Sequence, residues 1–237
     1  MSTDAVHVTV EIPARGALRS RVSEGAAKRL FPDVKRILDI ALALTLLVFT
    51  GPVLAIAALA LALQGPVFFT QLRVGRGDTR FRCFKLRTMY VDAEARLAAC
   101  LAADPDARRD WDRHQKLKSD PRITRLGRLL RRCSLDEVPQ VFNVLRGEMS
   151  FVGPRPIIAP EIAGYGADAE YHRSAAFADY ARCRPGITGL WQVSGRHRTT
   201  HAERRRLDRI YAQSRSLWLD AYILTLTVGV VLSLSGR

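Results

Sequence analysis

The sequence predicts an α+β protein, mostly helical, built as a monotopic membrane protein. Three observations lead to this fold class: an almost continuous apolar run at 37–63, two β-rich stretches around a Gly-Asp turn, and helical periodicity over much of the rest. They predict an N-terminal re-entrant helix-break-helix hairpin, a small β-hairpin and interfacial amphipathic helices. We expect a flexible tail at 1–33, a re-entrant membrane helix at 34–64, and a cytosolic-face domain with a C-terminal interfacial helix at 65–237.

Composition limits the possible partners and compartments. A chain of 237 residues that is 48% hydrophobic can bury a core, and its net charge of +14 favours phosphate groups or anionic lipid as partners. The four cysteines are far apart, without a CxxC motif or a histidine at metal-ligand spacing, so we expect reduced thiols. The first 34 residues are polar, and we expect no secretory signal there.

The apolar run has the length of a membrane helix but not its continuity. As one helix, 37–63 would measure roughly 40 Å, more than a bilayer core of about 30 Å. Thr50-Gly51-Pro52 near its middle predicts a break or sharp kink, and each half alone is too short to cross. Basic residues flank both ends, and positive charge prefers the cytoplasmic side. Re-entry is therefore favoured, with a simple span and a buried soluble helix as alternatives.

The elements that follow are shorter. Stretches 67–69 and 81–85 predict a β-hairpin around Gly75-Arg76-Gly77-Asp78. Lys85 and Arg87 follow it, either as phosphate contacts or as a solvated basic strand edge. Residues 92–118 have a helical pattern that Asp104-Pro105 divides into two helices.

A basic amphipathic helix is predicted at 122–132. Its apolar residues recur at helical spacing, and arginines occupy most of the other positions. Such a helix lies readily in the interface of an anionic membrane. Nucleic acid is the less favoured partner, because stacking aromatic residues and a recognisable binding motif are missing from this stretch.

The acid pair Asp136-Glu137 is the strongest chemical signal. Ser134 and Glu137 have the spacing of a helix capping box, which would make the acids structural. However, the arginine cluster before them would keep Asp136 ionised and attract a polyanion. Arg155 and Arg184, each in a proline-glycine turn, suit a diphosphate clamp.

Six motifs in order resemble those of the bacterial sugar transferases, the monotopic polyprenyl-phosphate hexose-1-phosphate transferases that begin exopolysaccharide assembly. The motifs are KRILDI (35–40), GPVFFTQLRVG (65–75), FKLRTM (84–89), the stretch from DPRITRLG to FVGPRP (120–156), RPGITGLWQVSGR (184–196) and SLWLDAYILTLT (216–227). The resemblance covers about 34–234. It is closest to the undecaprenyl-phosphate galactose phosphotransferase branch.

The resemblance implies roles for individual residues. Asp136 matches the nucleophile of the family and Glu137 its Mg²⁺-binding partner, whereas Pro52 matches the break of the membrane helix. Arginines that contact phosphate or nucleotide in the family are matched by Arg131, Arg155 and Arg184. A second active-site acid of the family is matched by Asp208. Gly51 stands where serine is usual, which puts the hydrogen bonding of the bend in doubt.

The activity implied is transfer of hexose-1-phosphate, of galactose or glucose, from a UDP-sugar to undecaprenyl phosphate. It would run through a covalent aspartyl-phosphosugar, releasing UMP, at the cytoplasmic face of the bacterial inner membrane. The expected partners are UDP-sugar, undecaprenyl phosphate, Mg²⁺ and anionic membrane lipids, with no nucleic acid. The oligomeric state stays open, with a homodimer as one option. The competing class is a membrane-surface anchor without enzymatic activity.

Overall fold

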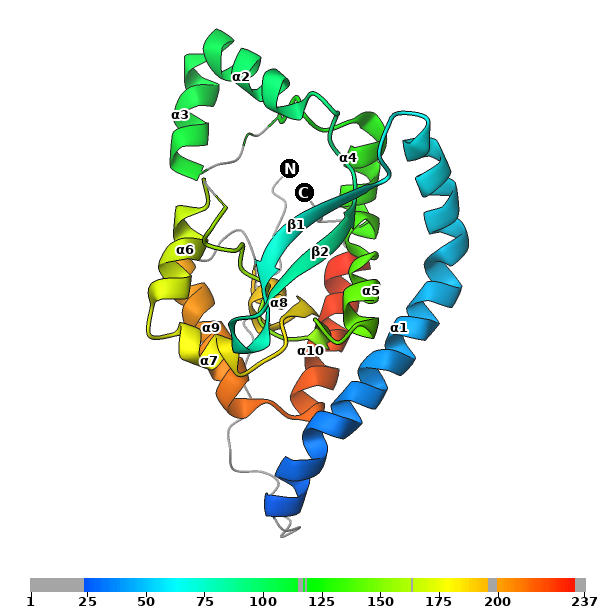
Figure 1. Ribbon diagram of the computed structural model, residues 1–237, viewed down its shortest axis with the longest axis vertical. Coiled ribbons are helices and arrows are strands. Elements are labelled where there is room, and N and C mark those ends of the chain that lie inside the picture. The colour runs from blue at the N-terminus through cyan, green and yellow to red at the C-terminus, as the bar shows by residue number, and fades with distance from the viewer. Residues whose placement is uncertain (1–23, 115–116, 118, 163, 196–199, 233–237) are drawn as a thin grey trace, which may run out of the picture. The chain divides into compact units, whose positions relative to one another are not determined.

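The computed structural model describes residues 24–114, 117, 119–162, 164–195 and 200–232. The chain divides into two compact units, each described here by itself. Figure 1 labels its helices and strands. The first unit takes in Met1–Phe49, Gln71–Cys83 and Gln140–Val230, and the second takes in Thr50–Thr70, Phe84–Pro139 and Val231–Arg237.

Helix α1 (Glu24–Ala62) is continuous, so the expected interruption at Pro52 is not confirmed. Proline removes one N–H donor but has a helical φ, and the hydrogen bonds of neighbouring turns can carry a helix past it. The helix starts inside the segment expected as a tail. Over Phe31–Ala62 its most apolar stretch has a mean hydropathy of 2.4, and 11% of that stretch is buried. In length and composition it could cross a membrane, and its exposure argues against a soluble core helix.

The polar residues at the start of the apolar stretch bind α1 to the rest of the first unit. Lys35 Nζ lies 2.5 Å from Asp220 Oδ2, and Arg36 donates to two backbone carbonyls of α5 (Gln140–Leu145) at 2.5 and 3.0 Å. Asp39 Oδ1 accepts hydrogen bonds of 3.0 Å from Ser150 Oγ and the Phe151 N–H. The KRILDI motif therefore anchors this end of α1 through three charged side chains.

The predicted β-hairpin is confirmed. β1 (Phe68–Val74) pairs with β2 (Arg80–Leu86), and the turn between them contains the 3₁₀ helix η1 (Arg76–Asp78). Within the first unit, Phe81 and Cys83 of β2 pack in one apolar cluster with Ala43 of α1 and Val141 of α5. The tip of the hairpin and the first part of α1 thus share a core.

A second pair of strands was not anticipated. β3 (Ser150–Val152) runs parallel to β4 (Gly186–Thr188), with Ser150 opposite Gly186. The chains approach so closely that a Cβ on Gly186 would lie 2.2 Å from the backbone nitrogen of Gly153. The two glycine-proline motifs, expected as separate turns, are therefore joined backbone to backbone.

Helices make up the remainder of the first unit. They are α6 (Gly166–Arg173), α7 (Phe177–Ala181), α8 (Leu190–Val193), α9 (His201–Ser214) and α10 (Leu217–Leu232), whose last residues lie beyond this unit. A cluster that includes Val152, Leu207 and Ile223 joins β3 to α9 and α10. The predicted C-terminal apolar helix is confirmed as α10.

The second unit holds the helices around the acid pair: α2 (Ala93–Ala103), α3 (Pro105–His114) and α4 (Arg125–Arg132). The division at Asp104-Pro105 is confirmed, with Pro105 as the first residue of α3. Thr124 caps α4 by accepting from the Gly127 N–H at 2.8 Å. A Cβ on Gly127 would lie 2.0 Å from Thr88 O, so only glycine allows α4 to pack against the end of β2.

Candidate active site

The acid pair lies on η2 (Leu135–Glu137), a 3₁₀ turn between α4 and α5. Ser134 has a left-handed backbone with φ 56°, and its side chain makes no capping hydrogen bond. The capping-box interpretation is therefore wrong, because a left-handed residue points its side chain away from the N–H groups that it would cap. A non-glycine residue in this region carries backbone strain of the kind found at functional sites.

Asp136 is a buried carboxylate, with 8% of its surface exposed. Burial and, to a smaller extent, the neighbouring Glu137 raise its pKa to about 6, whereas Lys85 and Arg131 act in the opposite direction. At neutral pH the group is still mostly ionised, yet it is poorly hydrated. A carboxylate of this kind is available for nucleophilic attack.

Glu137 has a direct countercharge. Lys85 Nζ lies 2.6 Å from Glu137 Oε1, and both side chains are about one-fifth exposed. Lys85 extends from β2, 52 residues earlier in the chain. The structure places Lys85 beside the acid pair and not at a fully solvated strand edge, and its role as a phosphate contact stays a prediction.

Arg131, near the end of α4, is oriented by a hydroxyl group. Its Nε donates to Thr88 Oγ1 at 2.8 Å. Burial lowers the pKa of this guanidinium, and Asp136 and Asp120 partly offset that effect. Since an arginine stays protonated under such a shift, Arg131 is a fixed positive charge near Asp136.

Sequence reasoning missed three residues of this unit: Thr88, Asp120 and Arg122. Arg122 forms a fork with Asp120, with N···O distances of 2.9, 3.1 and 2.7 Å, and its guanidinium lies 4.8 Å from the centroid of the Trp111 ring. The i, i+2 spacing of Asp120 and Arg122 could have indicated an ion pair. For Thr88 the sequence holds no indication of its contact with Arg131, apart from its place in the FKLRTM motif.

Arg87 has a different environment. Its guanidinium donates to three backbone carbonyls, Pro66 O at 2.6 Å, Leu61 O at 3.3 Å and Met89 O at 3.4 Å. These contacts join β2 to the end of α1. They account for an arginine at this position without a phosphate ligand.

The other expected site residues belong to the first unit. Asp208 is 2% exposed, accepts a 3.0 Å hydrogen bond from Tyr171, and has a pKa raised to about 6 by burial. The Arg184 Nε donates to Gly147 O at 3.0 Å, and the Arg155 guanidinium lies 6.0 Å from the Trp191 ring centroid. The structure thus brings together Lys85, Arg131, Asp136 and Glu137, whereas Arg155, Arg184 and Asp208 lie in the other unit.

The donor set for Mg²⁺ consists of few protein atoms. Among the described residues, no group of three or more His, Cys, Asp or Glu side chains could enclose a metal ion. Mg²⁺ is commonly held by one or two carboxylates, with substrate phosphates and water as the other ligands. Two adjacent carboxylates, one of them buried, fit that mode, and Glu137 is the more exposed of the two.

Comparisons with known proteins show which family the chain is similar to. The family model described as "Bacterial sugar transferase" matches residues 30–234. The UDP-galactose-lipid carrier transferase of Erwinia amylovora is 43% identical over 91% of this chain and 44% of its own length. The exopolysaccharide production protein ExoY of Rhizobium meliloti is 39% identical over 87% of this chain and 89% of its own. The undecaprenyl-phosphate glucose phosphotransferase of Komagataeibacter xylinus is 40% identical over 82% of this chain and 35% of its own length. The chain spans less than half the length of the first and last of these relatives.

Proposed function

The chain belongs to the bacterial sugar transferase family, and from that premise we propose that it transfers a hexose-1-phosphate from a UDP-sugar to undecaprenyl phosphate. The relatives named above act, by their names, on a galactose and a glucose substrate, and both sugars are candidates here. The reaction would be the first membrane step of exopolysaccharide synthesis.

The observation that carries this proposal is the environment of Asp136. A carboxylate that is 8% exposed, with a pKa near 6 and a basic residue on either side, is energetically unfavourable for a purely structural role. A protein that only anchors at a membrane surface does not require such a buried carboxylate. Strongly shifted carboxylates next to specific charges are characteristic of catalytic sites.

In the first step Asp136 attacks the sugar-bearing phosphorus of the UDP-sugar. An oxygen lone pair of the carboxylate forms the new P–O bond, and the bond to the bridging diphosphate oxygen breaks. UMP leaves with that electron pair, and a sugar phosphate stays on the aspartate. Because the carboxylate is ionised above about pH 6 and held on a short 3₁₀ turn, little reorganisation precedes attack.

The basic residues stabilise the charge that this step moves. Arg131, held by Thr88, provides a guanidinium for equatorial phosphate oxygens. Lys85 compensates the charge of Glu137 and favours the ionised form of Asp136. Glu137 would hold Mg²⁺, which when bound neutralises diphosphate charge.

In the second step the phosphate oxygen of undecaprenyl phosphate attacks the same phosphorus. The bond to Asp136 breaks, the carboxylate recovers its electron pair, and undecaprenyl-diphospho-sugar leaves. The two steps restore the enzyme without an external base, because both nucleophiles are already anionic.

The membrane arrangement that we propose places both ends of α1 at the cytoplasmic face of the inner membrane. Residues before the apolar stretch contact the first unit through Lys35 and Arg36. Residues after it return to the same unit, where Phe81 packs against Ala43. A straight crossing between these points would put them on opposite sides of the membrane. The contacts of both with one unit therefore support a return to the same face, for which α1, continuous here, would have to bend within the membrane.

The test is UMP release from a panel of UDP-sugars, using membranes that contain the chain and undecaprenyl phosphate. We expect UMP only with a matching sugar and only while Asp136 is present. Omitting the lipid should leave a radiolabelled sugar phosphate on wild-type protein. The matched control is Asp106→Asn, a surface acid paired with Arg109, which should keep full activity. UMP release by Asp136→Asn at the wild-type rate would overturn the proposal.

A further inference from the structure

A small cavity in the first unit is lined by basic side chains. It has a volume of about 100 Å³, and its basic lining residues are Lys35, Arg76, Arg182, Arg184 and Arg215. The described residues that line it include no carboxylate. Such a concentration of positive charge around a cavity attracts anions.

The neighbouring acids neutralise this charge only in part. Asp220 pairs with Lys35 at 2.5 Å, and Asp179 reaches Arg182 only at 3.8 Å while also contacting Arg209 at 3.3 Å. Burial lowers the pKa of Arg184, and the nearby Arg76 and Arg36 lower it further, whereas Asp39 acts in the opposite direction. The five basic lining residues outnumber these three acids, so a net positive charge remains around the cavity.

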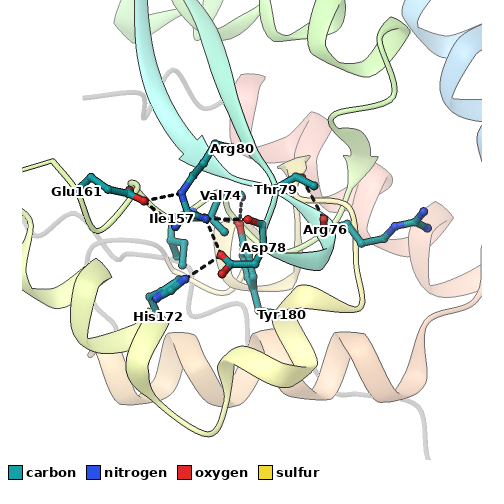
Figure 2. A network of polar contacts seen from close by, with 9 residues as sticks. All are labelled: Val74, Arg76, Asp78, Thr79, Arg80, Ile157, Glu161, His172 and Tyr180. Carbon is teal, nitrogen blue, oxygen red and sulfur yellow. Dashed lines mark hydrogen bonds and ion pairs between the residues drawn. The ribbon is translucent and has the colours of Figure 1, made fainter.

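The turn that presents Arg76 is held by a polar network (Figure 2). Asp78 Oδ1 accepts from Arg80 at 2.6 Å and from His172 Nε2 at 2.8 Å, and Thr79 Oγ1 donates to Arg76 O at 3.0 Å. Gly77 and Asp78 both have left-handed backbones, with φ of 66° and 64°.

Arg76 itself stands outside this network. Figure 2 shows its side chain pointing away from Asp78 and His172. Within the described part of the chain its guanidinium has no hydrogen bond or ion pair, although the turn that carries it is fixed. A rigid turn that holds an exposed arginine over a basic cavity is arranged to meet an external ligand.

The cavity adjoins the start of the membrane helix. Phe31 and Pro32 line it, and the continuous apolar run of α1 starts a few residues later, at Ile37. Trp218, at the start of α10 and three residues after Arg215, is 75% exposed, and tryptophan favours the membrane–water interface. These features place the cavity at the depth of lipid headgroups whenever α1 is embedded.

We propose that this cavity binds the phosphate group of an anionic phospholipid headgroup. A volume of about 100 Å³ corresponds to about three water molecules, which suits one phosphate group, whereas pockets for larger ligands measure about 300 Å³ or more. The site would fix the depth and tilt of α1 and is separate in chemistry from sugar transfer. The proposal depends on membrane association but not on the transfer reaction.

The experiment measures retention of phosphatidylglycerol and phosphatidylcholine by the full chain in detergent, using native mass spectrometry. The test variant is Arg76→Gln with Arg182→Gln, because both side chains are exposed and neither forms a close structural contact. The matched control is Arg205→Gln with Arg206→Gln, two arginines of α9 that pair with Glu170 and Glu203. Arg76→Lys with Arg182→Lys restores the charge.

Wild-type protein should retain phosphatidylglycerol in preference to phosphatidylcholine. The test variant should bind it about 25-fold more weakly, at about 5-fold per basic residue, while the control and the lysine variant stay near wild type. An equal loss in the control would show general surface attraction and overturn the proposal. Displacement of the lipid by inorganic phosphate would also overturn the proposal, because it would indicate a site for a soluble anion. A tenfold preference for undecaprenyl phosphate over phosphatidylglycerol would overturn it too, because it would indicate a site for the transfer substrate.

Discussion

Lys85 Nζ lies 2.6 Å from Glu137 Oε1, so the second acid of the pair receives the direct ion pair while Asp136 remains the buried carboxylate with the raised pKa. Two adjacent acids thus have different environments. The difference supports the proposed roles, attack for Asp136 and Mg²⁺ binding for Glu137.

Replacing the two neighbours of Asp136 should move its pKa in opposite directions. Lys85→Met removes a positive charge that lowers this pKa, so the acid limb of the residual single-turnover rate should move to higher pH. Glu137→Gln removes a negative charge that raises it, and the limb should move to lower pH. Both rates should fall. Shifts in the same direction would contradict this assignment.

The pH dependence of kcat/KM in the wild-type protein should have an acid limb near pH 6. Asp136 must be ionised to attack, and its pKa is raised to about 6 chiefly by burial. Activity should therefore rise about fivefold from pH 5 to pH 6 and level off above pH 7. A limb near pH 4 would mean that Asp136 is hydrated in the working enzyme.

Asp136→Asn should abolish turnover, by at least about 1000-fold, and stabilise the protein at neutral pH. The folded pKa of Asp136 is above its unfolded value, so the folded state binds this proton more tightly and the free energy of unfolding falls as pH rises from about 4 to 6. Removing the buried charge should increase the free energy of unfolding by about 1–3 kcal/mol at pH 7 and leave it unchanged at pH 3. Thermal melting at both pH values measures this difference in stability. Destabilisation at pH 7 would contradict the burial argument.

Thr88→Val should weaken catalysis without unfolding the chain. The variant removes the hydroxyl that receives the Arg131 Nε hydrogen bond, so the guanidinium loses its fixed position. We expect kcat/KM to fall about 10- to 150-fold, as for loss of one hydrogen bond to a charged group. Thr225→Val, which removes an exposed hydroxyl bond to Tyr222 O, is the control. Equal losses in the two variants would argue against a positioning role for Thr88.

Both ends of α1 should be accessible from the cytoplasmic side. A single cysteine introduced at Ser23 and another at Gln64 should both react with a membrane-impermeant maleimide in inverted vesicles and not in right-side-out spheroplasts. The physical reason is the contact of Lys35 and of Phe81 with the same unit. Labelling of the two positions from opposite sides would establish a simple span.

Local pattern was enough for several elements of the fold. Continuous hydropathy identified the membrane helix, alternation around Gly75-Arg76-Gly77-Asp78 identified the hairpin, and Asp104-Pro105 divided two helices as expected. These features depend on residues that are close together in the sequence, and the periodic patterns of helices and strands are read over the same short range. Pro52 shows the limit of the same method, since it predicts a lost hydrogen bond but not whether the surrounding turns continue the helix.

The sequence by itself determined which residues are candidates for the site, because the acid pair and the arginine cluster before it are adjacent in the chain. The tertiary structure alone decided that Lys85 pairs with Glu137, that Thr88 holds Arg131, and that Asp136 is buried. Each of these depends on segments more than 40 residues apart in the chain being packed together. Hydration, and with it the pKa of a carboxylate, follows from that packing and not from its neighbours in sequence.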